Sequence, residues 1–187
     1  ESWEAYDVNG KIIDKGETLG KTLNYKLYNP QGFVVTEGQI VKGKYEGTWN
    51  FYDSYGQKTE ARCLKNNEVD GNDTLFFENG TVKAVKAYKK SLLDGYYEEY
   101  FLNGSLHKEG WYVDDNKQGM WKEYFIDGSL NTINYYANDD FQGWQDYFHP
   151  SGKLKEQSFF EFGHFASKIL YDTLEKPYFK ASIENGN

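Results

Sequence analysis

Apolar and aromatic residues recur along this chain with a period of 24 residues, and two sets of glycines mark the repeat. The first set is Gly47, Gly71, Gly95, Gly119 and Gly143, and the second is Gly32, Gly56, Gly80, Gly104, Gly128 and Gly152. Gly10 precedes the second set by 22 residues. A period in the range of about 20–50 residues is typical of stacked repeat proteins.

Three columns keep their character from unit to unit when each unit is numbered from its first glycine as zero. Position five is Tyr28, Tyr52, Phe76, Tyr100, Tyr124 and Phe148. Position eleven is Val34, Lys58, Val82, Leu106, Leu130 and Leu154, and position seventeen is Ile40, Leu64, Tyr88, Tyr112, Tyr136 and Phe160. Such columns are what a stacked core needs, because each unit buries its apolar face only against its neighbours.

The residues at the second set of glycines predict β-hairpins. Asn79-Gly80, Asn103-Gly104 and Asp127-Gly128 are strong hairpin-turn pairs. Polar stretches such as Asp114-Asp115-Asn116 precede the first set and mark the opposite edge of the sheet. No segment shows a helical period. The sequence therefore predicts an all-β fold, an elongated single-sheet antiparallel meander of about six 24-residue hairpin repeats.

The pattern weakens at both ends, which predicts three parts. Residues 1–22 form a half repeat that acts as an N-terminal cap, residues 23–166 form the repeat array, and residues 167–187 form a degenerate C-terminal cap. Atypical end units are expected, because an open sheet edge must be protected from pairing with other chains. The chain starts at Glu1, so we expect a processed or trimmed product with any targeting segment removed.

The spacing of glycines and rings resembles the MORN repeat, and more closely its bacterial variant form. The clearest matches are Gly95-Tyr97-Tyr100-Phe101-Gly104-Leu106 and Gly119-Trp121-Tyr124-Phe125-Gly128-Leu130. The resemblance implies a hairpin-repeat architecture without a catalytic site, and bacterial proteins of this type are often labelled antitoxins of toxin–antitoxin systems. Asp73 and Gln145 stand where an aromatic residue is usual, which indicates looser or adapted units.

The turn geometry decides which columns share a face of the sheet, because a slip of one residue moves a side chain to the other face. A three-residue loop with glycine in the left-handed region predicts positions five, eleven and seventeen on one face. A two-residue turn predicts positions two, six, eleven and seventeen together. We favour the first, which leaves positions two, six and sixteen on the opposite face.

The rings of that opposite face in residues 95–137 are the candidate binding residues. They are Tyr97, Phe101, Trp111, Trp121, Phe125 and Tyr135. One interpretation is that these rings only pack against each other and cover the sheet. The other is that they form an aromatic strip for a partner, since aromatic side chains bring large contact area at low entropy cost.

Composition and charge exclude several functional classes. The chain has 21 Lys and Arg residues and 29 Asp and Glu residues, a formal net charge of −8. This charge disfavours binding to nucleic acid and to anionic lipid. A single cysteine cannot form a disulfide within the chain, and the three histidines do not have the spacing of metal ligands, so we expect neither a disulfide nor a metal site. No apolar run reaches the length of about 20 residues that spans a bilayer. We expect no cofactor, and an exported or cell-envelope location is favoured over the cytoplasm.

Two groups of acidic residues are candidates for metal binding or catalysis. Asp114, Asp115, Asp139 and Asp140 fit solvated turns better than a calcium site, because no EF-hand spacing is present. Glu98-Glu99 with Glu123 fits a surface row better than a glycosidase pair, because a single-layer sheet encloses no pocket. The sequence thus predicts no enzyme. It favours a repeat scaffold that binds another protein along an aromatic face, and the family resemblance implies that this scaffold is antitoxin-like. The alternative is a carbohydrate or cell-wall binding module.

Overall fold

The computed structural model describes residues 2–6, 12–17 and 22–183, and within these ranges the chain is built of antiparallel strands without helices. The strands β3 to β17 follow one another in chain order in a 15-stranded sheet, with the short strand β13 beside β12. The predicted all-β meander of hairpins is therefore confirmed. Across the described residues there is no helix with the length and apolar character needed to cross a bilayer.

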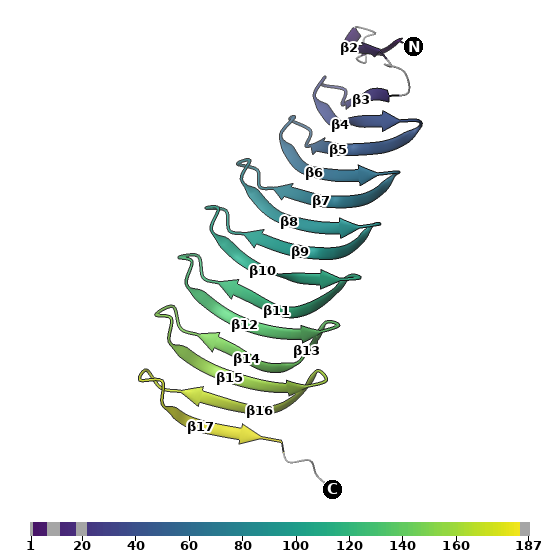
Figure 1. The fold of residues 1–187 in the computed structure, drawn as a ribbon. Helices are drawn as coiled ribbons and strands as arrows, with labels where there is room; N and C mark the ends of the chain where they lie inside the picture. The colour runs from purple at the N-terminus through teal and green to yellow at the C-terminus, as the bar shows by residue number, and fades with distance from the viewer. Residues whose placement is uncertain (1, 7–11, 18–21, 184–187) are drawn as a thin grey trace. The chain divides into compact units, whose positions relative to one another are not determined.

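By their internal contacts the residues divide into two units, 1–92 and 93–187. The first unit contains a separate hairpin of β1 (Ser2–Tyr6) and β2 (Ile12–Glu17). Its meander consists of β3 (Thr22–Tyr28), β4 (Val34–Val41), β5 (Lys44–Tyr52), β6 (Lys58–Lys65), β7 (Glu68–Phe76) and β8 (Val82–Lys89) (Figure 1). Gly10 lies outside the described residues, and the division into two caps and an array stays a prediction.

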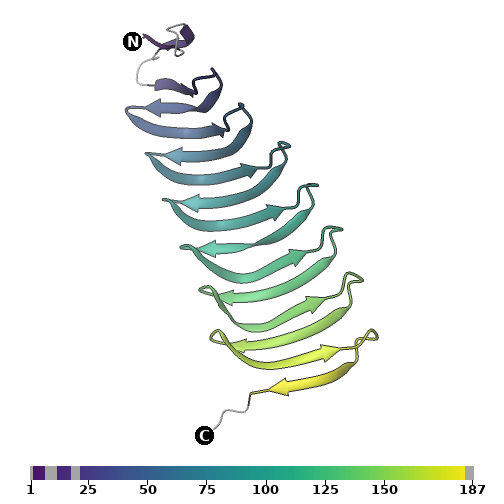
Figure 2. The same ribbon diagram turned by 180° about the vertical axis from the view of Figure 1, so that it is seen from behind.

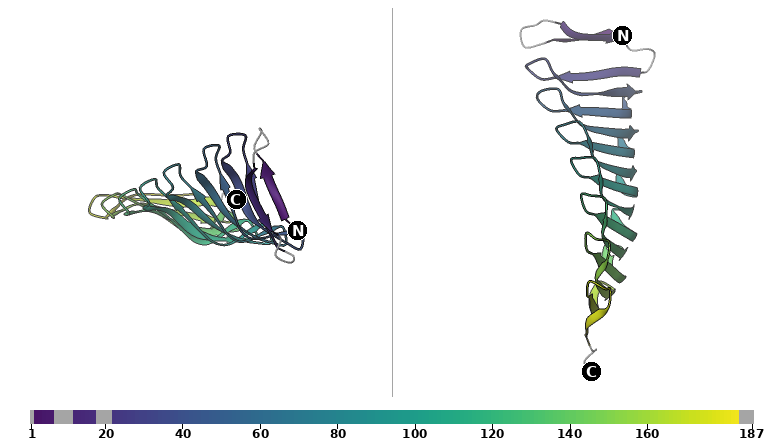
Figure 3. Two further views of the ribbon diagram at one scale, coloured as in Figure 1. Left: turned by 90° about the horizontal axis from the view of Figure 1, so that it is seen from above. Right: turned by 90° about the vertical axis from the view of Figure 1, so that its left-hand side faces the viewer.

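The second unit continues the same pattern of hairpins. It consists of β9 (Leu92–Tyr100, which starts at the boundary), β10 (Leu106–Val113), β11 (Asn116–Tyr124), β12 (Leu130–Ala137), β13 (Asp140–Phe141), β14 (Gly143–Phe148), β15 (Leu154–Glu161), β16 (His164–Tyr171) and β17 (Pro177–Ser182). Figures 1 and 2 show the strands of each unit curving along their length. Figure 3 shows each unit as a single layer of strands, so a side chain lies on one face or the other.

The two edges of the sheet use different turns. At the Asn-Gly and Asp-Gly edge, Phe125 N donates to Ser129 O at 2.8 Å and Gly128 N donates to Phe125 O at 2.9 Å. Gly128 has φ +85°, so this is the three-residue loop with left-handed glycine that we favoured. At the other edge Asp114 and Asp115 both have positive φ, 47° and 67°, which is the two-residue turn typical of tight hairpins.

A β-bulge after each three-residue loop makes the predicted grouping of the columns wrong. Glu123 pairs with Thr132, but the next residue, Tyr124, pairs with Leu130, so one extra residue is inserted. Because of this extra residue, the side chains from position thirteen onward switch faces relative to position eleven. Position seventeen therefore lies on the same face as position two. Positions five, eleven and sixteen share one face, and positions two and seventeen share the other. We call these the stripe face and the ring face.

The ring face carries the best-packed part of the sheet. Trp121 lies on Gly110 of the neighbouring strand and is only 2% exposed, and Trp49 lies on Gly38 in the same way. The Trp121 indole nitrogen donates to the Trp111 carbonyl oxygen at 3.2 Å. A chain of ring contacts continues along this face through Tyr97, Tyr112, Trp121, Tyr136, Phe141, Phe160 and Phe165.

The two units that lack the usual ring at position two have polar contacts in its place. Asp73 is buried opposite Arg62, with Nε and Oδ2 3.8 Å apart. Gln145 is fully buried. The backbone pairing of β12 with β14 stops after Ile133 and Asp146, and beyond this point the side-chain amide of Gln145 replaces the backbone hydrogen bonds. Its Oε1 accepts from Tyr135 N at 3.0 Å and its Nε2 donates to Tyr135 O at 3.2 Å. Polar pairing thus replaces ring packing at these places.

Candidate functional site

The six candidate ring residues do not form one strip. Tyr97 and Trp121 lie on the ring face with their ring centroids 5.6 Å apart, and the near-complete burial of Trp121 makes it part of the core. Phe101 and Phe125 flank the three-residue loops, where the Phe101 ring packs on His107 with 4.3 Å between centroids. Tyr97, Trp121 and Phe101 thus pack against other rings of the sheet.

The other two candidates, Trp111 and Tyr135, lie on the stripe face and are 54% and 41% exposed. They belong to a row of large side chains that crosses successive strands of the second unit, and we call this row the aromatic stripe. Its members are Tyr96, Trp111, Met120, Tyr135, Trp144 and Phe159. Met120 pairs directly with Tyr135 across β11 and β12. At the two ends of the stripe, ring centroids are 5.4 Å apart for Tyr96 and Trp111 and 5.0 Å apart for Trp144 and Phe159.

The stripe contains two exposed residues that the sequence reasoning missed. Met120 and Trp144 occupy position one of their units and are 44% and 39% exposed. The signal that could have identified them is the bulge: with its extra residue counted, positions one and sixteen fall on the same face. The periodicity of the apolar columns did not include position one, because its character changes between units.

Among the described strands β3 to β8 of the first unit there is no equivalent stripe, although these strands have the same positions. Position sixteen there is Gln39, Cys63 and Ala87, and position one is Thr48 and Asn72. The fold therefore forms with small or polar residues at these places. The rings in the second unit are not required by the architecture, and an exposed apolar row that the fold does not need is typical of a binding surface.

The charge of the chain is distributed as unevenly as the rings. Residues 93–187 hold 16 Asp and Glu against 8 Lys and Arg, whereas residues 1–92 hold 13 of each kind. The formal net charge of −8 therefore belongs to the unit that carries the stripe. A negative field around exposed rings attracts cationic groups and repels anionic ones.

Two shallow grooves lie along the stripe. The first, of about 430 Å³, is lined by Tyr96, Glu109, Trp111, Gln118, Met120 and Lys122 together with the backbone at Gly110 and Gly119. The second, of about 580 Å³, is lined by Tyr135, Gln142, Trp144, Asp146 and Gln157, with Tyr136 and the backbone at Gly119 and Gly143. Each groove thus places exposed rings next to polar side chains.

Glu109 is held in a fixed position in the first groove. Its carboxylate accepts hydrogen bonds from the hydroxyls of Tyr96 and, at 2.6 Å, of Tyr124, and Lys122 Nζ lies 3.7 Å away. Burial by itself raises the pKa of Glu109, but the two tyrosine hydroxyls and Lys122 outweigh it and lower this pKa below its usual value. Burial and the bond to Glu109 raise the pKa of Tyr124 to about 12. The carboxylate is therefore ionised and already paired.

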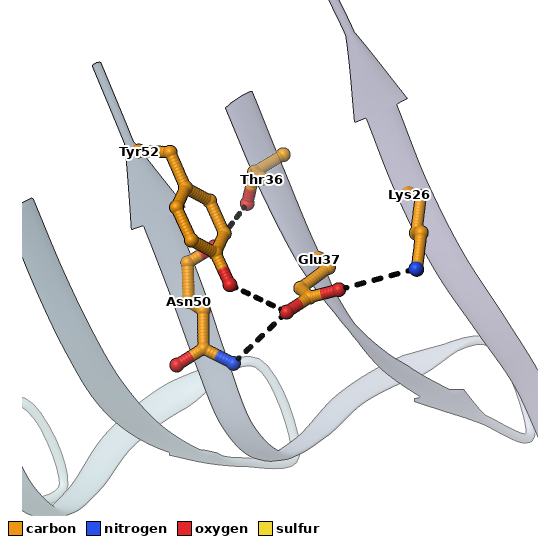
Figure 4. A network of polar contacts seen from close by, with 5 residues as sticks. All are labelled: Lys26, Thr36, Glu37, Asn50 and Tyr52. Carbon is orange, nitrogen blue, oxygen red and sulfur yellow. Dashed lines mark hydrogen bonds and ion pairs between the residues drawn. The ribbon is translucent and has the colours of Figure 1, made fainter. Parts of the chain in front are cut away.

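The same polar arrangement occurs in the first unit, around Glu37 (Figure 4). Tyr52 donates to Glu37 Oε1 at 2.6 Å, Asn50 Nδ2 lies 3.4 Å from the same atom, and Lys26 Nζ lies 3.5 Å from Oε2. Burial and this hydrogen bond raise the pKa of Tyr52 to about 12. Because it recurs at strands without the aromatic stripe, the glutamate–tyrosine network is part of the common fold and does not depend on the stripe.

The acidic turn residues have structural partners. Asp115 Oδ1 accepts from Leu93 N at 2.7 Å while Asp115 N donates to Leu93 O at 2.9 Å. Asp139 makes the same pair of bonds with Lys117, at 2.7 and 3.1 Å. Each turn therefore fastens its hairpin to the preceding one. Among the residues the structure describes, no group of three or more His, Cys, Asp or Glu side chains could hold a metal ion.

The glutamates considered as a catalytic pair lie on different faces or have cationic neighbours. Glu99 and Glu123 both flank Lys108 on the ring face, and Lys108 Nζ lies 2.7 Å from Glu123. Glu99 also accepts from the Tyr97 hydroxyl at 2.9 Å. Glu98 pairs with Glu109 on the stripe face. This placement is that of a charged surface row.

Comparison with known proteins adds little to this geometry. No family model and no curated protein matches the chain. Among solved structures, the chain aligns with "Crystal Structure of TcdB2-TccC3-Cdc42" at 11% identity and a TM-score of 0.22, covering 96% of this chain and 13% of that one. For "Crystal Structure of TcdB2-TccC3" the identity is 11%, the TM-score 0.22 and the coverage 99% and 14%. The chain spans about a seventh of these proteins, and at this TM-score the likeness carries no argument.

Proposed function

We propose that this chain is a non-catalytic repeat scaffold that binds another protein through the aromatic stripe of its second unit. The observation that carries the proposal is the restriction of the stripe to that unit. The same positions of the first unit hold small or polar residues, so the exposed rings are a local addition to a common architecture. Aromatic side chains and methionine are enriched at protein interfaces, where they supply most of the contact area.

The partner is basic. The stripe lies in the unit that carries the whole formal net charge of −8. Complementary charge speeds encounter and selects among partners, while the rings supply area. We also propose that the chain is a MORN-like protein with an antitoxin-like role. The 24-residue hairpin repeat supports the MORN-like architecture. A basic partner is compatible with the antitoxin-like role.

The proposal is tested by comparing two variants in affinity capture followed by a binding measurement with each purified candidate. Trp111→Ser/Met120→Ser removes two exposed side chains of the stripe. Tyr55→Ser/Phe162→Ser removes two strongly exposed rings outside it and serves as the matched control. We expect a basic protein whose affinity falls at least about tenfold with the stripe variant and is unchanged with the control, provided both variants keep the wild-type circular dichroism spectrum. A partner bound equally by both variants would contradict the proposal.

A carbohydrate is the second candidate ligand, and the composition of the grooves favours it specifically. Trp111 lies beside Gln118, and Trp144 lies beside Gln142 and Gln157, so flat apolar platforms stand next to amides that can bond sugar hydroxyls. The negative charge of this unit gives a neutral glycan no advantage, which is why the protein partner is preferred. Retention on an insoluble polysaccharide that is lost in Trp111→Ser/Met120→Ser would replace the first proposal by this one.

A further inference from the structure

The two grooves of the stripe differ in one chemical respect. Position three of the repeat is Lys122 in the first groove and Asp146 in the second. In the first groove the ammonium group of Lys122 lies 3.7 Å from Glu109 and neutralises it. In the second groove, among the described residues that line it, Asp146 is the only one with a charged side chain. The second groove is therefore a negatively charged site between exposed rings.

The carboxylate of Asp146 keeps capacity for a ligand. Its Oδ1 accepts one hydrogen bond, from Gln157 Nε2 at 2.8 Å, whereas an ionised carboxylate offers about four acceptor sites. Within the described part of the chain no lysine or arginine forms an ion pair with it. Tyr135 and Trp144, at 41% and 39% exposure, line the same groove and present their rings to solvent.

We propose that the groove of Tyr135, Trp144 and Asp146 is a guanidinium site that takes an arginine side chain of the protein partner. A guanidinium is planar and weakly hydrated, stacks on aromatic faces, and presents a fork of N–H donors that matches a carboxylate. The groove supplies both elements, two rings and one uncompensated carboxylate. This inference rests on the proposed function and specifies which group of the basic partner the second unit recognises.

The difference between the grooves also explains how the arginine is placed. Because Lys122 neutralises Glu109, the first groove offers a cation no net attraction, and it takes the apolar part of the partner on Trp111 and Met120. The arginine enters the second groove, one repeat further along the stripe. Because only the second groove attracts a cation, the two grooves fix the direction in which an extended basic segment lies across the strands.

The experiment is calorimetric titration of the full chain with a short arginine–glycine–serine peptide and with its citrulline counterpart, which has the same shape without the charge. We expect the arginine peptide to bind at least about tenfold more tightly than the citrulline peptide. Asp146→Asn and Trp144→Ala should each weaken the arginine peptide about tenfold, and Trp144→Phe should restore most of the loss. Asp146→Lys, which copies position three of the first groove, should abolish binding.

Asp140→Asn is the matched control, because it removes the same charge from an exposed position at the start of β13, in the same unit but outside the groove. Its affinity should stay within about twofold of wild type, since the Asp140 side chain is exposed and does not line the groove, and salt screens exposed charges. The site would be overturned by equal binding of the two peptides, or by an equal loss of affinity in Asp140→Asn and Asp146→Asn. It would also be overturned if choline, titrated as a second cation, bound more tightly than the arginine peptide. If the site fails while the partner is still lost with Trp111→Ser/Met120→Ser, the proposed function stands; if both fail, neither does.

Discussion

Replacing Gly110 with alanine should destabilise the second unit through a direct clash with Trp121. A Cβ atom built on Gly110 would lie 2.2 Å from Cδ2 and 2.4 Å from Cε2 of that indole. Carbon atoms in contact prefer about 3.5–4.0 Å, so the indole must retreat by more than about 1 Å. Trp121 is almost fully buried and its ring lies 5.6 Å from Tyr97 and 5.0 Å from Tyr112, so it cannot move without losing these contacts.

The expected cost is about 3 kcal/mol, because overpacking a dense site costs about 1–3 kcal/mol and each aromatic pair is worth about 0.5–1.5 kcal/mol more than its area. The assay is urea unfolding followed by far-ultraviolet circular dichroism, with Trp121→Ala as the second mutation of a double-mutant cycle. In the Trp121→Ala background the clash is gone and Gly110→Ala should stabilise by about 0.5 kcal/mol, since alanine restricts the unfolded chain. If Gly110→Ala has the same effect in both backgrounds, the packing described for this face is incorrect.

Three further predictions concern stability. Asp115→Ala should cost about 1 kcal/mol in urea unfolding, because it removes the hydrogen bond to Leu93 N, whereas Asp115→Asn keeps an acceptor and should cost less than half as much; equal costs would exclude the proposed fastening of the hairpins. The lowered pKa of Glu109 means that its stabilisation is present above its ordinary value of 4.5 and is lost as the pH falls through the folded-state value. The stability difference between wild type and Glu109→Gln should therefore shrink from pH 7 to pH 3, and a difference independent of pH would refute the network. Gln145→Leu should lower the free energy of unfolding by about 2–3 kcal/mol, because the Tyr135 amide loses its buried acceptor. For the same reason, hydrogen exchange at the Tyr135 amide should become faster. Unchanged exchange there would show that the Gln145 side chain does not bridge the two strands.

Much of the architecture could be predicted from the sequence, because glycine has few substitutes where the backbone must adopt positive φ. The loop glycines such as Gly128, at φ +85°, recur for this reason, and they identify both the period and the three-residue loop. The hairpin meander follows from these turns. The correct loop nevertheless led to the wrong grouping of columns, since the bulge beside Tyr124 and Leu130 inserts a residue without a sequence signature of its own.

The candidate site was only partly accessible to sequence reasoning for the same reason. Two of the six candidates, Trp111 and Tyr135, lie on the exposed stripe, whereas Trp121 proved to be core. A tryptophan at position two and one at position sixteen look alike in the sequence. What separates them is the neighbouring strand. Gly110, at the register shift between β10 and β11, leaves room for the Trp121 indole against the backbone, and this contact is visible only once the strand register is known.

Hydroxyl-radical footprinting of the chain with and without its purified protein partner tests the central claim most directly, because it reports the accessibility of each oxidisable side chain. The account predicts strong protection of Trp111, Met120, Tyr135 and Trp144 in the complex, and unchanged oxidation of Tyr55 in the first unit. Protection of Tyr55 with unchanged oxidation of the four stripe residues would contradict it, and would place the binding surface away from the aromatic stripe.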